Sequence, residues 1–232
     1  MKELQKTIKA EWLKLKGLGL VYAAIVFALI GPTVLYILLF MSAGTQNADT
    51  PAINVFEDLL MENLPPYPRF FLILFIIIAA SRICQTDHKN GGWLLMETQP
   101  VSKLNIFLAK YLNLLFLIFL SIVSFFVFCY LFSALWEVTF STVKRSWAFD
   151  PAFHATAFLK MFISSWGTAA FMLFISLIIP GYLWAFAIGV MGIILNFVSL
   201  GTGRPFPFSP LYPEMVAFSS TNVRSLNTML GY

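Results

Sequence analysis

The chain has 232 residues, of which 59% are hydrophobic and only 11% are charged, with a net charge of +4. An ordinary soluble domain has about 25% charged residues, so the composition excludes that class and predicts an all-α integral membrane protein. The net charge is too small to indicate binding to nucleic acid, and the lipid bilayer is the expected surrounding.

The first 17 residues, MKELQKTIKAEWLKLKG, have the pattern of an amphipathic helix. Its apolar face consists of Leu4, Ile8, Trp12 and Leu15, and lysines occupy much of the remainder. Such a helix lies at the membrane interface, with its apolar face in the acyl boundary and its lysines near anionic lipid. The alternative is a solvated leader that only sets the topology, but Trp12 would be badly placed in water.

Five apolar runs follow, and each is expected to cross the bilayer, since a span needs about 20 apolar residues. Their approximate ranges are 18–41, 67–84, 105–134, 155–179 and 182–200. The last two could form one long broken helix, but their combined length and the dipeptide Pro180-Gly181 favour a helical hairpin. Residues 201–232 are expected to be an extracytoplasmic segment that leads to a sixth span missing from this chain.

Basic residues are distributed unevenly between the two sides of these spans. The N-terminal segment carries five lysines, and the region around the second and third spans carries Arg82, Lys89, Lys103 and Lys110. Because cytoplasmic loops carry an excess of Lys and Arg, we expect a plasma-membrane protein with its N-terminus and residues 85–104 in the cytoplasm. Lys110 and Lys160 lie furthest inside proposed spans, and each is close enough to one end to snorkel.

The loop between the second and third spans, residues 87–102, reads DHKNGGWLLMETQPVS and holds a short apolar cluster. Gly91-Gly92 loosens the start of the cluster, Pro100 disfavours helix at the residue before it, and Ser102 can cap the next helix. Exposed apolar clusters are usually docking sites for a partner or a membrane. The alternative is that the cluster folds back onto the spans of its own chain.

Two stretches in this order resemble the permease subunit of type-2 ABC transporters, the group that includes lantibiotic-immunity and bacitracin-type exporters. AEWLKLKG, residues 10–17, resembles the connecting helix of that family. GGWLLMETQPVSKLNIFLAKYL, residues 91–112, is similar to its cytoplasmic element Gly-x-Trp-x-x-Leu-x-x-x-Pro-Val-Ser-Arg. Met96 stands where the family has leucine, and Lys103 stands where it has arginine.

The resemblance implies that residues 87–102 hold a coupling helix, which sits in a groove of a separate ATP-binding subunit and transmits its movement to the spans. The implied contact residues, apolar anchors and rim charges together, are Asp87, Lys89, Trp93, Leu94, Leu95, Met96 and Glu97. The resemblance also implies a second permease subunit, identical or different. The expected activity is export or extraction of an amphipathic or hydrophobic substrate, such as a peptide, a lipid or a drug.

The sequence contains no G-x-x-x-x-G-K-[ST] motif, so ATP and Mg²⁺ are expected on the partner subunit, and this chain is expected to be neither an enzyme nor a cofactor or metal carrier. His154 and Lys160 are candidates for the substrate path, with a structural ion-pair role near Asp150 as the alternative. Two other functions stay open at this point: a non-transporting membrane anchor or assembly subunit, and an intramembrane enzyme.

Overall fold

The computed structural model describes residues 2–42, 67–89, 102–139, 151–179 and 181–201. The elements in these ranges are all helices: α1 (Lys2–Lys16), α2 (Leu20–Ser42), η2 (Tyr67–Leu72), α4 (Ile73–Lys89), α6 (Lys103–Thr139), α7 (Pro151–Ile178) and α8 (Tyr182–Gly201). The short π-helix η2 leads directly into α4. The all-α architecture predicted from the composition is therefore confirmed.

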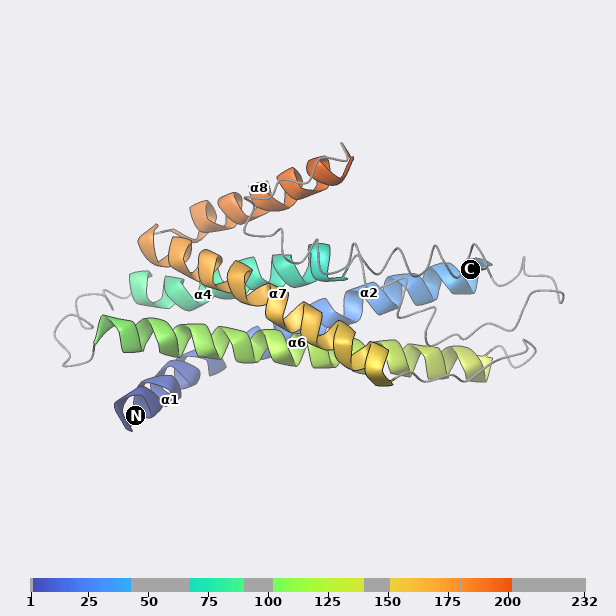
Figure 1. Ribbon diagram of the computed structural model, residues 1–232, viewed down its shortest axis with the longest axis horizontal. Coiled ribbons are helices and arrows are strands. Elements are labelled where there is room, and N and C mark those ends of the chain that lie inside the picture. Colours follow the sequence, from blue (N-terminus) through green and yellow to red (C-terminus); the bar gives the residue numbers. More distant parts are fainter. Residues whose placement is uncertain (1, 43–66, 90–101, 140–150, 180, 202–232) are drawn as a thin grey trace.

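Local sequence signals explain where several helices begin and end. Gly19 separates α1 from α2 with a φ of 67°, a left-handed conformation that glycine adopts at little cost. Ser102 caps α6, because its hydroxyl accepts a hydrogen bond from the Asn105 N–H at 3.3 Å. Between α7 and α8, the Gly181 N–H donates to the Ile179 carbonyl at 2.8 Å. The two helices are separate, as predicted, and Figure 1 shows that the chain reverses direction between them.

Several boundaries differ from their predictions by a few residues, and the one at the end of α4 matters for the site. α4 continues to Lys89, beyond the predicted end of the second span, so Asp87 and His88 belong to this helix and not to the following loop. The sequence explains the difference, since no glycine or proline interrupts the chain between Ile73 and Gly91. The rest of the predicted coupling segment, residues 90–101, lies outside the described residues.

The longest helix, α6, runs along the length of the bundle (Figure 1). α2 packs against α6, whereas α1 and α7 cross it obliquely. α4 packs against α7 and α8, and the span that η2 and α4 form together is the most enclosed of the four candidate spans, with 67% of its apolar window buried, compared with 28% for α2. Phe75, Ile76 and Ile77 of α4 are fully buried. The core of the bundle is therefore built around α4.

Among the described residues, four helical stretches are long and apolar enough to cross a membrane: Leu20–Leu38, Tyr67–His88, Lys103–Trp136 and Pro151–Ile178. The apolar part of α8 is the shorter stretch Tyr182–Leu195. Over its full length α8 has 20 residues, and at about 1.5 Å per residue it measures about 30 Å, the thickness of a hydrocarbon core. Its crossing of the membrane stays a prediction.

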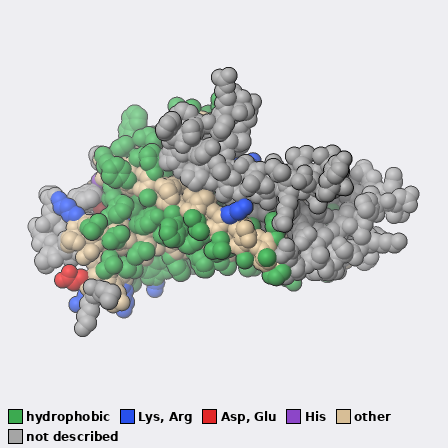
Figure 2. Space-filling view, in the orientation of Figure 1, with side chains coloured by type: hydrophobic (Ala, Val, Ile, Leu, Met, Phe, Trp, Pro, Cys, Tyr) green, Lys and Arg blue, Asp and Glu red, His purple; other side chains and the backbone are tan. Residues whose placement is uncertain are grey.

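The surface of the bundle agrees with a membrane setting. Figure 2 shows hydrophobic side chains over most of the described middle of one face, whereas the acidic and most of the basic side chains lie toward the end where α1 begins, and a few basic ones lie elsewhere on the face. Such a separation is expected when the sides of a bundle face lipid and its end faces water.

A buried polar chain joins η2, α6 and α2 in the interior. The Ser121 hydroxyl donates to the Ala24 carbonyl at 3.0 Å, so the Tyr67 hydroxyl is the donor in its 2.9 Å contact with Ser121 Oγ. The Tyr67 ring also stacks on Phe125, with 3.9 Å between centroids. Hydrogen bonds between helices are one of the forces that associate them in lipid, and these contacts hold the beginning of η2 against α2 and α6.

Candidate functional site

Four charged side chains meet where α1, α4 and α6 come together. This charge cluster consists of Glu11 and Lys14 from α1, Asp87 from α4 and Lys110 from α6. Lys110 Nζ lies 2.6 Å from Glu11 Oε2 and contacts Asp87 Oδ2. Lys14 Nζ lies 2.7 Å from Glu11 Oε1 and 3.1 Å from Asp87 Oδ1. Each carboxylate therefore pairs with both lysines, and the formal charges of the cluster cancel.

The charge cluster is buried except on the side of Lys14. The Lys110 side chain has no exposed surface, those of Glu11 and Asp87 are 7% and 5% exposed, and that of Lys14 is 41% exposed. Burying an ammonium without a counter-charge would cost on the order of several kcal/mol of desolvation free energy. Here the two carboxylates compensate the charge of Lys110. The prediction that Lys110 snorkels to the interface is therefore wrong, because Glu11 and Asp87 hold its ammonium inside the bundle.

Local structure brings these residues into position. Glu11 and Lys14 are three residues apart on α1, so their side chains share one helix face. Asp87 lies in the last turn of α4, where the negative end of the helix dipole disfavours a carboxylate. The two lysines offset this unfavourable position, and in doing so they tie the end of α4 to α1 and α6.

Lys14 is the member of the cluster that reaches the surface. Burial acts to lower its pKa, but hydrogen bonds and charge interactions with Glu11 and Asp87 outweigh burial and raise the pKa above the ordinary value of 10.5. Because the pKa is raised in the folded protein, the stabilisation from Lys14 is fully present below the ordinary value and is lost only as the pH rises through the raised one. The link between α1 and α4 therefore does not weaken through Lys14 at neutral pH.

Further contacts hold α1 on α6 beside the charge cluster. The Asn113 side-chain amide donates to the Ile8 carbonyl at 3.3 Å. The Trp12 ring meets Phe116 edge-on, with 5.1 Å between centroids. α1 is thus attached to α6 by ionic, polar and aromatic contacts at one crossing point.

These contacts determine where the predicted apolar face of α1 lies. Leu15 is buried in the protein core, and Leu4, Ile8 and Trp12 are partly buried. Part of this face therefore packs on protein. Its contact with the membrane interface stays a prediction.

Of the predicted partner-binding residues, Asp87 is the one whose side chain the structure describes. Lys89 is the last residue of α4, and the remaining ones, Trp93, Leu94, Leu95, Met96 and Glu97, lie outside the described residues. The Asp87 carboxylate pairs with two lysines of its own chain. This burial places Asp87 inside the charge cluster, and not at the expected rim of an interface with another subunit.

His154 and Lys160 are not brought together by the structure. His154 is buried near the start of α7, with its ring edge-on to those of Phe126 and Phe153 at 6.4 Å and 5.5 Å between centroids. Lys160 is exposed. Six residues correspond to about 240° around an α-helix, so the two side chains point to different sides of α7. Asp150 lies outside the described residues.

Lys110 stands out in the sequence as a charge inside an apolar run, but its partners were not predicted. The signal that points to them is Glu11, an acidic residue within a lysine-rich amphipathic helix, together with Asp87 at the end of the adjacent span. Two carboxylates near the same membrane boundary as a buried lysine are candidates for its counter-charges. Among the residues that the structure describes, no group of three His, Cys, Asp or Glu side chains could hold a metal ion.

Residues 7–200 of the chain match the family model of the ABC-2 family transporter proteins. The matched range includes all four residues of the charge cluster and both stretches that carry the resemblance to type-2 permeases. No curated protein and no solved structure matches the chain. The match identifies the family but does not identify a subgroup within it. The chain therefore belongs to the ABC-2 family, as a multi-pass membrane permease component of an ABC transporter that works with an ATP-binding subunit.

Proposed function

We propose that this permease exports or extracts an amphipathic or hydrophobic molecule, such as a peptide, a lipid or a drug, driven by ATP hydrolysis on its ATP-binding subunit. The outward faces of α7 and α8 support this cargo class, because they carry exposed apolar side chains such as Phe174, Trp184 and Met191. Apart from the charge cluster, the described spans contain few charges. A path along such helices suits a hydrophobic or amphipathic molecule better than a sugar or an ion.

The main support for the proposal is that the charge cluster includes residues from the helix that precedes residues 90–101 and from the helix that follows them. Asp87 lies in α4 just before this segment, and Lys110 lies near the start of α6 just after it. The contact between them ties the two flanking helices together, and Glu11 adds α1 to the same unit. A displacement of residues 90–101 by an ATP-binding subunit would therefore move α1, α4 and α6 together.

The same proposal includes the orientation and composition of the complex. The lysine-rich N-terminus, α1 and residues 90–101 lie on the cytoplasmic side of the plasma membrane, in agreement with the positive-inside rule. Two permease subunits, identical or different, assemble with ATP-binding subunits. ATP and Mg²⁺ bind to those subunits, and this chain has no catalytic role.

The proposal is tested at Trp93, the expected anchor of the coupling helix. Replacing Trp93 by Glu places a charge where a desolvated aromatic contact is expected, so the ATP-binding subunit should no longer co-purify with the permease. Trp93→Phe keeps an aromatic anchor and serves as the matched control, with at least half of the subunit retained. The measurement is the ratio of the two subunits after affinity purification, followed by the ATPase activity of the complex. A Trp93→Glu variant with a normal subunit ratio and normal ATPase activity would refute this coupling role.

A further inference from the structure

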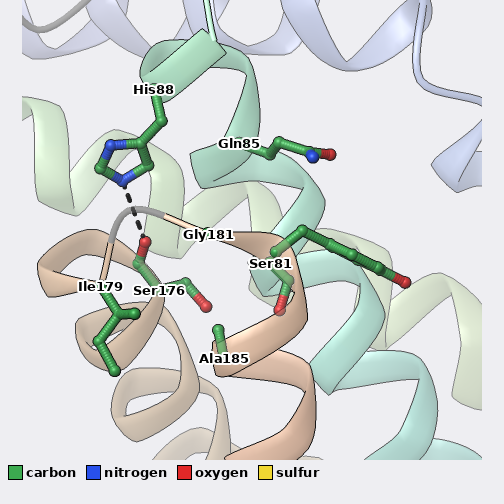
Figure 3. A pocket seen from close by; sticks show the side chains of 8 residues that line it. Ser81, Gln85, His88, Ser176, Ile179, Gly181 and Ala185 are labelled. Carbon is green, nitrogen blue, oxygen red and sulfur yellow. Dashed lines mark hydrogen bonds between the residues drawn. The ribbon is translucent and has the colours of Figure 1, made fainter.

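A cavity of ≈ 240 Å³ lies between α4, α7 and α8 (Figure 3). Its polar lining comes from Ser81, Gln85 and His88 of α4 and Ser176 of α7, and α8 contributes Tyr182 and Ala185. Among its lining residues, all of which the structure describes, there is no acidic side chain, lysine or arginine. The cavity therefore offers hydrogen-bonding groups without a fixed charge.

Two hydroxyls in this cavity are unusual for serines in helices. Ser81 and Ser176 are 2% and 3% exposed, and neither hydroxyl has a hydrogen-bond partner among the described residues. Helical serines commonly bond to a carbonyl three or four residues earlier, as Ser164 of α7 does to the Met161 carbonyl at 3.0 Å. In Figure 3 the hydroxyls of Ser81 and Ser176 instead point into the space between the three helices. A buried hydroxyl without a partner is unfavourable, so this arrangement indicates a ligand that supplies the missing bonds.

The cavity and the charge cluster both include residues from the last turn of α4. His88 Nε2 lies 3.3 Å from the Ser176 backbone carbonyl, and the nitrogen is the donor because a carbonyl oxygen only accepts. The neighbouring residue, Asp87, belongs to the charge cluster. The end of α4 thus lies between the cluster and the cavity, and a displacement of this end would change the shape of the cavity.

We propose that this cavity binds a neutral hydrogen-bonding group, a hydroxyl or an amide, on an amphipathic membrane molecule. Each serine hydroxyl offers one donor and two acceptor positions, which matches the mixed donors and acceptors of such groups. The cavity is smaller than the roughly 300–1,000 Å³ of pockets that enclose a drug-sized ligand. It therefore holds the polar part of the molecule, while the apolar part lies along the outer faces of the helices. This inference rests on the proposed function, since it names the class of cargo that the permease binds.

The same chemistry occurs in a lipid headgroup with hydroxyls and in the backbone of an acylated peptide. The test distinguishes these two sources with photoreactive probes that carry a diazirine in the acyl chain. One probe is a diacylglycerol, the second is an N-acyl dipeptide amide, and the third is a plain alkane without a polar group. Labelling is measured on the full permease complex in detergent without ATP, and the labelled peptides are located by mass spectrometry.

We expect at least one of the two polar probes to label the peptides of α4, α7 or α8 that line the cavity, and the one that does so identifies the source. Ser81→Ala and Ser176→Ala should each raise the probe concentration for half-maximal labelling by about three- to tenfold, the loss of one neutral hydrogen bond. Ser164→Ala, which removes a hydroxyl bonded within its own helix, should leave this concentration unchanged. Labelling by the alkane should not depend on Ser81 or Ser176.

Stability separates a ligand-binding role of the two serines from a structural one. Because neither hydroxyl has a partner, the alanine variants should keep the thermal midpoint of the wild-type complex or raise it. As a second route, Ala185→Phe should fill the cavity and abolish labelling by the polar probes. The proposal is wrong if neither polar probe labels the cavity in a serine-dependent way, which would leave a cavity that holds water only. It is also wrong if both alanine variants lower the midpoint.

The outcome is independent of the test at Trp93, because binding is measured without ATP. A cavity that does not bind the probes, in a complex that Trp93→Glu still disrupts, would refute this inference alone. Serine-dependent labelling in a complex that is indifferent to Trp93→Glu would instead refute the proposed coupling and leave the binding site standing.

Discussion

The Lys110 side chain is fully buried, and its ammonium lies between the carboxylates of Glu11 and Asp87. In such a setting the cost of removing charges from water nearly cancels their attraction, so a complete buried cluster adds little net stability. Removal of one member has a larger effect, because the remaining charges then lack compensation. The charge cluster therefore acts mainly by selecting which helix faces meet.

The first prediction concerns Lys110 itself. Lys110→Met should lower the stability of the permease by about 3–5 kcal/mol, because two buried carboxylates are left with Lys14 alone. Lys160→Met is the matched control, since Lys160 is an exposed lysine of α7, and it should stay within about 0.5 kcal/mol of the wild type. The measurement is the thermal midpoint of the purified protein in detergent.

A rescue experiment checks the cause of this loss. When Glu11→Gln and Asp87→Asn are added to Lys110→Met, the buried charges are removed together, and most of the stability should return. Equal midpoints for Lys110→Met and Lys160→Met would contradict the importance of the cluster. A triple variant that is less stable than Lys110→Met alone would contradict the electrostatic explanation.

At the scale of the elements, α4 and α8 approach each other closely at Gly189. A Cβ atom at this position would lie 2.7 Å from Ile77 Cγ1 and 2.8 Å from Ile77 Cγ2. Both carbon atoms are attached directly to the Ile77 Cβ, and a β-branched side chain in a helix strongly prefers one χ1 rotamer, so a rotation that moves both atoms away is unfavourable. Small residues at helix contacts allow such close packing in membranes, and Gly189 thereby sets the separation of α4 and α8.

The second prediction follows from this contact. Gly189→Ala should destabilise the protein by about 1–3 kcal/mol through overpacking, and Ile77→Ala should relieve the overlap in the double variant. Gly167→Ala is the matched control, because no atom lies within 4 Å of a Cβ built at that position of α7. The measurement is the thermal midpoint of the wild type, of Gly189→Ala, of the double variant Gly189→Ala/Ile77→Ala and of Gly167→Ala. If Gly189→Ala and Gly167→Ala behave alike, α8 does not pack on α4 as described.

At the scale of the whole molecule, α4 connects three regions of the permease. Its last turn contributes Asp87 to the charge cluster, contributes His88 to the polar cavity and leads into residues 90–101. Its body packs against α7 and α8. Movement of the segment that follows α4 would therefore reach both α1 and the cavity through one rigid helix.

The third prediction separates this internal role of Asp87 from a direct contact with the ATP-binding subunit. Asp87→Asn should keep that subunit in the purified complex, unlike Trp93→Glu, but should lower the thermal midpoint because Lys110 loses one of its two counter-charges. Both quantities are measured on the same preparation. A variant that loses the subunit and keeps a normal midpoint would show that Asp87 contacts the partner after all.

Much of the fold could be predicted from local patterns. Hydropathy located the helices, Ser102 marked the start of α6, and the break before Tyr182 separated α7 from α8. The end of α4 was predicted too early, because the polar residues before Gly91 were assigned to a loop, although nothing in them interrupts a helix. The site was predicted less well, since the charge cluster joins Glu11 and Lys110 across 99 positions of sequence.

The sequence by itself determined the class of the protein, the helices and the resemblance to type-2 permeases, because hydropathy, caps and short motifs act over a few residues. Only the tertiary structure decided that Lys110 faces two carboxylates, that Gly189 admits Ile77 and that two serine hydroxyls share one cavity. The physical reason is that the orientation of each helix about its own axis is set by tertiary packing. Each residue advances by about 100° around its axis, so the face that a helix turns inward depends on how all the helices pack at once.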